Sequence, residues 1–281
     1  GYMSVEKLEI AKRHLVPKQM ELNGITEENL KLSDEIINEV IENYTRESGV
    51  RQLERCIASL CRKAAKRLVV NGDKELIVTK ENLRDYLGKK VHTFDVAKAE
   101  SRVGVVNGLA WTSVGGDTLQ IEAVTAAGSG KLELTGQLGD VMKESARTAL
   151  GHLRANAKAY ALDHVLWDKL DIHVHVPEGA VPKDGPSAGI TMTTALISAL
   201  SQRPVSQKIA MTGEITLTGR VLPIGGLREK LLAANRSEMT KIMIPEENRA
   251  DLTDIPEEIR EKLEIHTASS MEDVYKFVFG V

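Results

Sequence analysis

The sequence changes its hydrophobic pattern once, near residue 90, and this change limits the folds open to the chain. Before it, apolar residues recur every three or four positions, as they do between Ile36 and Ile41, which is typical of amphipathic helices. After it, alternating runs such as Asp171–Val176 are interleaved with helical stretches, the pattern of an α/β domain. We therefore predict a helical bundle with one short strand over residues 1–90, a polar linker over 91–101 and a mixed-sheet α/β domain over 102–281.

Capping and turn residues predict where several helices begin and end. Pro17 is expected to end the first helix, because proline has no backbone N–H and clashes with the preceding turn. Ser33 is expected to cap the helix that follows, and Asn71-Gly72 to end the long helix after it. Near the carboxyl end, Ser269 and Glu272 have the spacing of a capping box for the last helix.

Composition excludes two classes of protein. Of the 281 residues, 42% are hydrophobic and the net charge is only −3, so most of the chain is not expected to be disordered. The longest weakly polar run falls short of the roughly 20 apolar residues that span a bilayer, so we predict no membrane partner. The two cysteines, Cys56 and Cys61, lie about 140° apart on one predicted helix. We interpret them as small buried side chains of a reducing compartment, not as a disulfide or a zinc site.

One stretch of the first region is strongly basic. Between residues 51 and 67 the only acidic residue is Glu54, against six basic ones: Arg51, Arg55, Arg62, Lys63, Lys66 and Arg67. Such a stretch binds phosphate or DNA in some proteins. Without interleaved aromatic residues, a solvated helix face is the favoured interpretation.

A loop of the second region carries the first candidate for catalysis. It reads PKDGPSAG over residues 182–189, and a helix is predicted from about Ser187 to Leu200. Ser187 would then lie at a helix N-terminus, where free N–H groups and the positive end of the helix dipole favour an oxyanion. This position suits a nucleophile, although a serine that simply caps the helix is the common alternative.

A serine nucleophile needs a base, and Lys230 is the best candidate. On the predicted helix from Gly226 to Arg236 it lies at the edge of an apolar face, where loss of solvation would lower its pKa and allow the neutral amine to accept a proton. A lysine that extends from a core face to solvent is the alternative. Thr212 could orient the amine, and Asp184 could bind back to Ser187 or Lys230. A solvent-facing threonine and a turn-stabilising aspartate are their plain alternatives.

Three histidines offer weaker candidates. The loop also matches G-x-S-x-G at residues 185–189, so an α/β-hydrolase elbow with His266 as base is a rival. His266 alternates within a predicted strand, which disfavours that role. His173 and His175 share one face of a strand, but no third ligand is placed, so we predict no metal site and a structural or substrate-groove role.

Several motifs resemble one family closely. Residues 182–189, Gly213–Thr216 and Leu222–Lys230 resemble the proteolytic domain of Lon, the ATP-dependent AAA+ protease. Residues 1–90 are similar to the small helical lid subdomain of the same family, including Thr45–Arg51. The resemblance implies a Ser–Lys dyad with Ser187 as nucleophile and Lys230 as general base. It also implies that Thr212 supports the lysine, that Asp184 belongs to a loop with active and inactive states, and that Arg51 is the sensor-2 arginine that reads bound nucleotide.

The resemblance implies a function for the full-length protein. Lon-type enzymes are serine endopeptidases of the endopeptidase La type, which degrade misfolded and regulatory proteins with ATP and Mg²⁺. The resemblance further implies unfolded or tagged protein substrates, a hexameric ring, and a bacterial cytoplasmic location, with the mitochondrial matrix as alternative. No G-x-x-x-x-G-K-[ST] motif occurs in the sequence. From this and the start at Gly1 we expect a carboxyl-terminal piece that binds no cofactor and hydrolyses no ATP. A DNA-binding or ring-assembly module without activity of its own is the alternative.

Overall fold

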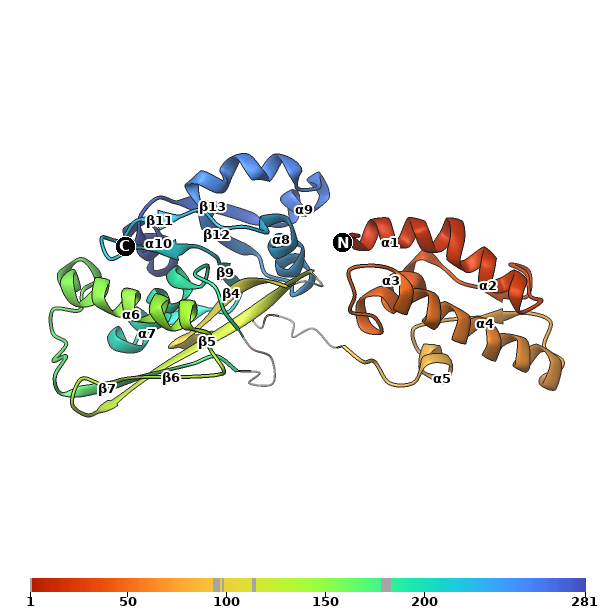
Figure 1. The fold of residues 1–281 in the computed structure, drawn as a ribbon, viewed down its shortest axis with the longest axis horizontal. Helices are drawn as coiled ribbons and strands as arrows, with labels where there is room; N and C mark the ends of the chain where they lie inside the picture. Colours follow the sequence, from red (N-terminus) through yellow and green to blue (C-terminus); the bar gives the residue numbers. More distant parts are fainter. Residues whose placement is uncertain (1, 93–96, 98, 113–114, 178–182) are drawn as a thin grey trace. The chain divides into compact units, whose positions relative to one another are not determined.

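The computed structural model describes residues 2–92, 97, 99–112, 115–177 and 183–281. The chain divides into two compact units, Gly1–Phe94 with Ser113–Gly115, and Asp95–Thr112 with Gly116–Val281 (Figure 1). Part of the predicted linker, residues 93–96 and 98, and residues 178–182 of the loop before Ser187 lie outside the described residues. The exact bounds predicted for the two domains and the linker stay a prediction.

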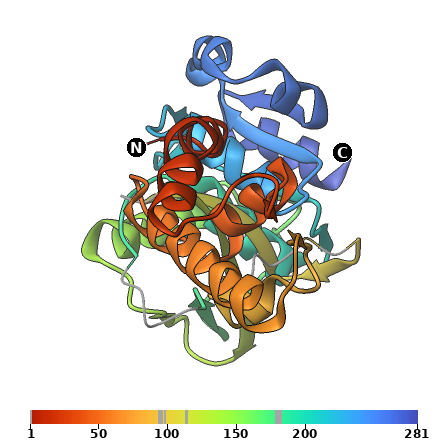
Figure 2. The ribbon, with the colours of Figure 1, turned by 90° about the vertical axis from the view of Figure 1, so that its right-hand side faces the viewer.

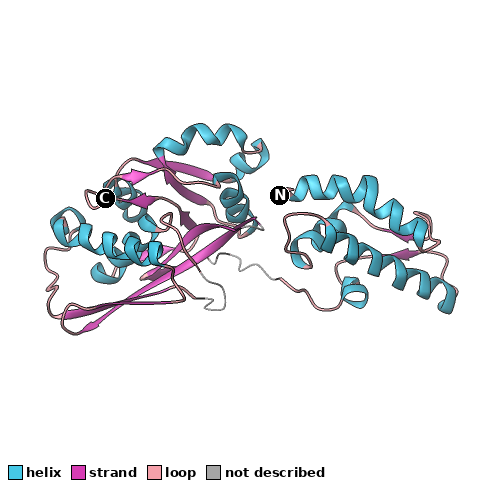
Figure 3. Ribbon diagram, viewed as in Figure 1, coloured by secondary structure: helices cyan, strands magenta, loops and turns pink. Residues whose placement is uncertain are grey.

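The first unit is a helical bundle, as predicted, with two short strands instead of one. Strands β1 (Leu30–Lys31) and β2 (Leu76–Ile77) pair in parallel. The helices are α1 (Ser4–Ile10), a π-helical turn (Ala11–Leu15), α2 (Val16–Leu22), α3 (Asp34–Asn43), α4 (Arg51–Asn71) and α5 (Leu83–Leu87) (Figure 3). Ser33 accepts a hydrogen bond from the N–H of Ile36 and so caps α3, as expected. Gly72, at φ 72°, ends α4 in the left-handed conformation, also as expected.

The prediction that Pro17 ends the first helix is wrong. The chain passes through the π-helical turn, and the N–H of Val16 bonds to the carbonyl of Ala11, five residues earlier. Pro17 then lies at the beginning of α2, in the first turn, where its missing N–H has no intrahelical partner to lose. The wider turn therefore allows the helical path to continue to Leu22.

The second unit contains a seven-stranded mixed sheet, which confirms the predicted α/β class. The strand order is β13-β12-β9-β4-β5-β7-β6, with β5 antiparallel to β7 and with β12 parallel to both β9 and β13. The sheet strands are β4 (Val105–Thr112), β5 (Gly115–Ala127), β6 (Leu132–Thr135), β7 (Leu170–His175), β9 (Ile209–Met211), β12 (Lys241–Pro245) and β13 (Glu264–Ala268). Two further antiparallel pairs lie outside the sheet: β3 (Ser101–Val103) with β8 (Pro204–Ser206), and β10 (Glu214–Ile215) with β11 (Val221–Leu222).

Helices cover both faces of this sheet (Figures 1 and 2). Successive residues of a strand point to opposite faces, and on β12 Met243 belongs to one buried cluster while Ile242 and Ile244 belong to another. The Met243 cluster includes α6 (Asp140–Ala155), α7 (Gly189–Ser201) and α10 (Met271–Phe279). The other includes α8 (Leu227–Arg236), and partly buried residues of a 3₁₀ helix (Glu246–Asp254) and of α9 (Glu257–Lys262) pack against it. A second 3₁₀ helix, Ala157–Tyr160, follows α6.

Two helix beginnings differ from their predictions by one or two residues. Helix α7 begins at Gly189 with Ala188 as its N-cap, so Ser187 precedes the cap instead of opening the helix. The capping box of α10 is formed by Ser270 and Asp273, not by Ser269 and Glu272. In both places the sequence offers two adjacent small residues, and for α7 the bonds of Gly213 and Thr212 to the Ser187 carbonyl place the start after Ser187.

Candidate active site

Ser187 lies at the junction between α7 and the segment that follows β9. Its carbonyl accepts the N–H of Gly213 at 2.8 Å and the hydroxyl of Thr212 at 3.4 Å. In return, the N–H of Ile190 donates to the carbonyl of Gly213 at 3.1 Å. Gly189 permits this close contact, because a Cβ at that position would lie 2.7 Å from the backbone nitrogen of Ile215. The backbone that carries Ser187 is therefore held from two sides.

Lys230 projects from α8 into the interior and is only 2% exposed. Its Nζ donates to Thr212 Oγ1 at 3.1 Å. Burial disfavours the charged ammonium and lowers the pKa of Lys230 to about 8. Among the described residues no carboxylate forms an ion pair with it. The sequence-based expectation of a desolvated lysine agrees with this environment.

Thr212 links the lysine to the serine backbone. It is fully buried, and its single hydroxyl accepts from Lys230 and donates to the Ser187 carbonyl. Within the described part of the chain, no hydrogen bond joins Ser187 Oγ directly to Lys230 Nζ. A neutral amine that donates one N–H to Thr212 still has its lone pair, so this arrangement leaves Lys230 able to accept a proton.

Two backbone N–H groups beside Ser187 are available to an anion. The N–H groups of Ser187 and Ala188 donate to no acceptor among the described residues. They precede α7, whose N-terminus adds the positive end of the helix dipole. Pro186, one residue earlier, has no N–H to offer. The sequence reasoning placed donors around Ser187 but did not identify which ones.

Asp184 is bound away from both Ser187 and Lys230. Its Oδ1 accepts the N–H of Met142 at 3.0 Å and that of Gly185 at 2.9 Å. Met142 is the third residue of α6, so the carboxylate caps this helix in place of a local side chain. Gly139 makes the contact possible, because a Cβ there would lie 2.2 Å from the Asp184 Cγ. Sequence reasoning missed this pairing, which joins residues 42 positions apart and has no local signal.

The candidate histidines have partners of their own. Thr135 Oγ1 lies 2.8 Å from His173 Nε2 and 2.7 Å from His175 Nδ1, so the two half-buried rings are bridged on one face of the sheet. His266 instead bonds to Glu264 at 2.6 Å and packs against Phe277. In the part of the chain that the structure describes, no three His, Cys, Asp or Glu residues are grouped to hold a metal ion.

The candidates of the first unit lie on α4. Arg51 is the first residue of this helix and is exposed. Lys63 donates to the Tyr86 carbonyl at 2.6 Å, and Arg67 lies over the Tyr86 ring at 4.7 Å, so these two cations attach α5 to α4. Cys61 is fully buried and free, and its burial raises its thiol pKa to about 11. This confirms its interpretation as a small buried side chain, whereas the same interpretation of Cys56 is wrong, because Cys56 is only partly buried.

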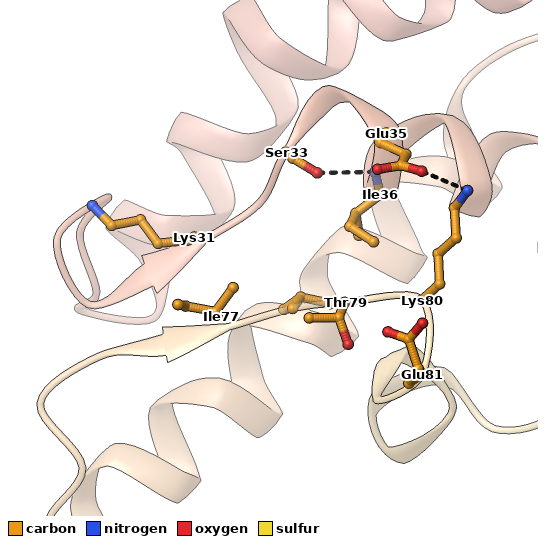
Figure 4. Close-up of a pocket in the computed structure, with 9 residues that line it drawn as sticks. Lys31, Ser33, Glu35, Ile36, Ile77, Thr79, Lys80 and Glu81 are labelled. Atoms are coloured by element: carbon orange, nitrogen blue, oxygen red, sulfur yellow. Dashed lines mark hydrogen bonds and ion pairs between the residues drawn. The ribbon is translucent and has the colours of Figure 1, made fainter.

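A hollow of about 340 Å³ lies elsewhere in the first unit, between the start of α3 and the residues after β2 (Figure 4). Its lining includes Ile36 and Ile77, and an ion pair of 2.6 Å between Lys80 and Glu35 links the two segments at one side of it. None of the predicted catalytic residues lines it. Among the described helices, none is long and apolar enough to cross a membrane.

Comparison with known proteins gives two family matches that together span most of the chain. The model of the Lon protease (S16) C-terminal proteolytic domain matches residues 77–280, and that of the Lon protease AAA+ ATPase lid domain matches residues 21–77. Lon protease 1 of Bacillus subtilis is 54% identical over 274 residues, which are 98% of this chain and 35% of that protein. The Lon proteases of Bacillus thuringiensis and Clostridioides difficile are 55% and 50% identical, and the match covers 98% of this chain and 34% and 35% of theirs. The chain thus spans about a third of the length of these relatives.

Proposed function

The chain belongs to the Lon protease (S16) family, and from this premise we propose that it is the lid and proteolytic part of an ATP-dependent serine endopeptidase. In this proposal Ser187 is the nucleophile and Lys230 is its general base. The observation that carries it is the buried Lys230 amine, whose Nζ is linked through Thr212 Oγ1 to the backbone of Ser187. A lysine with a pKa of about 8 is neutral in a useful fraction of molecules near neutral pH, and only the neutral form can accept a proton.

The proposed reaction is acyl transfer in two stages. Neutral Lys230 takes the proton of the Ser187 hydroxyl as Oγ attacks the scissile carbonyl. The oxyanion is stabilised by the N–H groups of Ser187 and Ala188. The Lys230 ammonium then protonates the leaving amine, and the C–N bond breaks to leave an acyl-enzyme. Water, deprotonated by Lys230, hydrolyses this ester and regenerates the serine.

Thr212 and Asp184 have supporting roles in this proposal. Thr212 orients the amine and fixes the serine backbone through one hydroxyl. Asp184 keeps its carboxylate on the N-terminus of α6, which leaves the amine without a negative neighbour. A carboxylate released from α6 would favour the ammonium form of Lys230 and so oppose its role as a base.

Covalent labelling tests the nucleophile directly. A fluorophosphonate reacts with activated serines, so we expect mass spectrometry to locate its adduct on Ser187. Ser187→Ala should abolish labelling and peptide cleavage, while Lys230→Ala should reduce both to background with the far-UV circular dichroism unchanged. Ser145→Ala, which removes another buried hydroxyl, serves as the matched control and should still be labelled. Full labelling in Lys230→Ala would overturn the dyad.

The same proposal extends to the complete protein. We propose that its substrates are misfolded, regulatory or tagged proteins, that it assembles as a hexameric ring in the bacterial cytoplasm, and that ATP and Mg²⁺ drive it. Arg51, exposed at the start of α4, is proposed to sense the nucleotide in that setting. Exposure of a charged guanidinium fits a residue that meets phosphate.

A second candidate function, DNA binding, is favoured by one observation on α4. At 100° per residue, Arg51, Arg55, Arg62 and Lys66 fall within roughly 60° of one another on the helix. All four are exposed, and none forms an ion pair within the described chain. Unpaired cations along one helix face match the regular negative charge of a nucleic-acid backbone.

Neutralisation of this stripe tests the second candidate. Arg55→Gln with Lys66→Gln should weaken binding of duplex DNA and flatten its salt dependence, because two phosphate contacts are lost. Lys63→Gln with Arg67→Gln removes the same charge from another face of α4 and should change binding less. Equal losses of DNA affinity in the two double variants would show that net charge, and not this stripe, determines the binding. Retention of binding in Ser187→Ala would separate it from proteolysis.

A further inference from the structure

The β10–β11 hairpin connects the two sides of the proposed site. It follows Thr212 and Gly213, and the chain continues from it to the helix that carries Lys230. At its near end, Gly213 bonds to Ser187 and Ile190, and the Ile215 backbone packs against Gly189. A displacement of the hairpin therefore moves the backbone that holds Ser187.

The hairpin is too small to hold its own position. Each of its strands has only two residues, and isolated two-stranded ribbons are marginally stable at best. Its far end is held from two directions. The Gly219 carbonyl accepts the N–H of Met271 at 2.8 Å, and the Leu217 carbonyl lies 3.0 Å from Nδ1 of His152 on α6.

The partners of His152 define where its proton lies. A carbonyl oxygen only accepts, so the contact with Leu217 requires a hydrogen on Nδ1. In the neutral ring Nε2 then has a lone pair, and Tyr160 O–H lies 2.6 Å from it as a donor. The Asn156 amide lies 3.3 Å from Nδ1 and donates one of its two hydrogens to the His152 carbonyl at 3.0 Å, so a protonated Nδ1 leaves only its second hydrogen without a ring acceptor. Both ring nitrogens are thus satisfied in the Nδ1–H tautomer.

The surroundings hold the ring in this orientation. His152 is 3% exposed, and Gly219, at φ 85°, lies so close that a Cβ there would be 2.5 Å from the His152 Cε1. Burial raises the pKa of Tyr160, so its hydroxyl keeps the hydrogen that it donates. Tyr160 in turn packs edge-on against Tyr275 of α10.

We propose that His152 is a positioning residue of the proposed peptidase: its Nδ1–H holds the Leu217 carbonyl, while Tyr160 bonds to its Nε2, and His152 thereby keeps the β10–β11 hairpin and the Gly213–Ser187 contact in place. This inference rests on the proposed function only for its effect on activity. The hydrogen-bonded arrangement itself is independent of any reaction. His152 touches neither substrate nor the reacting atoms.

Three variants separate the hydrogen bond from simple packing. His152→Leu fills the space without a donor, whereas His152→Asn keeps an N–H near the position of Nδ1 and can still reach Leu217. Tyr160→Phe keeps the edge-on ring contacts but removes the hydroxyl that bonds to Nε2. Thermal melting of each variant identifies any loss of the whole fold, so that local effects are read only from folded protein.

Amide hydrogen exchange and ring ¹⁵N NMR are the decisive measurements. In His152→Leu we expect exchange at Gly219, Arg220 and Gly213 to accelerate at least tenfold, with the α7 amides beyond Ile190 unchanged and with His152→Asn close to the parent. The parent should show the Nδ1–H tautomer of His152, and Tyr160→Phe should keep it, because the Leu217 carbonyl still requires the hydrogen on Nδ1. An Nε2–H tautomer in the parent, or unchanged exchange in His152→Leu, would overturn the inference.

Peptidase kinetics complete the test. His152→Leu should lower kcat about tenfold with little change in KM, and His152→Asn should restore most of it, because the serine is displaced while the substrate surface is not. If the parent chain cleaves no peptide at all, the proposed function fails. Hydrogen exchange and NMR still test whether His152 holds the hairpin in place. A normal kcat in His152→Leu together with accelerated exchange would show that His152 holds the hairpin but does not affect catalysis.

Discussion

Lys230 Nζ donates to Thr212 Oγ1 over 3.1 Å, and the same hydroxyl donates to the carbonyl of Ser187. The partner of this buried amine is therefore a neutral group. A carboxylate would have favoured the ammonium form, whereas a hydroxyl leaves the cost of desolvation uncompensated. The relationship has measurable consequences for activity, for stability and for the threonine itself.

The first prediction concerns the pH dependence of cleavage. In the proposed mechanism Lys230 acts as the neutral amine, and burial lowers its pKa to about 8. For a short fluorogenic peptide, kcat/KM should therefore rise with pH and level off above about 8. Changing Ser187 to cysteine supplies the control, because a thiol ionises more easily and should shift or flatten this limb. A profile that is flat from pH 6 to 9 in the parent chain would argue against a titrating amine.

The second prediction concerns stability. The folded-state pKa of Lys230 is about 8 against 10.5 for an ordinary lysine, so the unfolded state binds more protons between these values and stability rises with pH across this window. Below pH 8 the full penalty, about 3 kcal/mol, is present. Lys230→Met should therefore raise the melting temperature at pH 7 by several degrees, and its advantage should shrink as the pH approaches 10.

The exposed Lys276 of α10 gives the control for this measurement. Lys276→Met removes the same charge from the surface and should change the melting temperature little at either pH. If Lys230→Met melts below the parent at pH 7, or if its advantage does not depend on pH, the amine is not desolvated as the structure indicates.

The third prediction distinguishes the hydrogen bonds of the Thr212 hydroxyl from the packing of its side chain. Thr212→Val keeps the volume but loses both hydrogen bonds of the fully buried hydroxyl. Each neutral hydrogen bond contributes about 0.5–1.5 kcal/mol, and two are lost, so kcat should fall roughly 5- to 150-fold. Thr212→Ser retains the hydroxyl and should lose much less. Equal losses in the two variants would point to packing of the methyl group instead.

The sequence was most informative where chemistry depends on local pattern. Alternation along Asp171–Val176 correctly predicted β7. The position of Lys230 at the edge of an apolar helix face favoured a side chain that reaches solvent, and only the resemblance to Lon favoured a desolvated amine, whereas the structure buries it. The resemblance to Lon led to Thr212, which the structure brings together with Lys230 and the Ser187 carbonyl.

Features that depend on distant parts of the chain could not be predicted. Pro17 appeared to end a helix because propensity is local, while the π-helical turn that accommodates it is fixed by packing around Ala11 and Leu15. The start of α7 moved from Ser187 to Gly189 because Gly213 and Thr212 hold the Ser187 carbonyl in a turn. Asp184 bonds to the N–H of Met142, 42 residues earlier, and no periodicity records such a contact.

The fourth prediction tests the place of Asp184. A methyl group on Gly139 would lie 2.2 Å from the Asp184 Cγ, so Gly139→Ala must displace the carboxylate from the Met142 N–H. Loss of this cap costs about 1 kcal/mol and should lower the melting temperature by about 2–4 °C. The released carboxylate, three residues from Ser187, should also raise the pKa of Lys230. The rise of kcat/KM with pH should then occur at higher pH.

Asp184→Ala and the double variant distinguish these two effects. Asp184→Ala loses the same cap but releases no carboxylate. It should therefore have a lower melting temperature than the parent and keep the parent's pH profile of activity. Adding Asp184→Ala to Gly139→Ala should return the activity limb to its original pH without restoring the melting temperature. If the double variant keeps the shifted limb, then Gly139 acts through the backbone of α6 and the Asp184 carboxylate has no influence on the Lys230 amine.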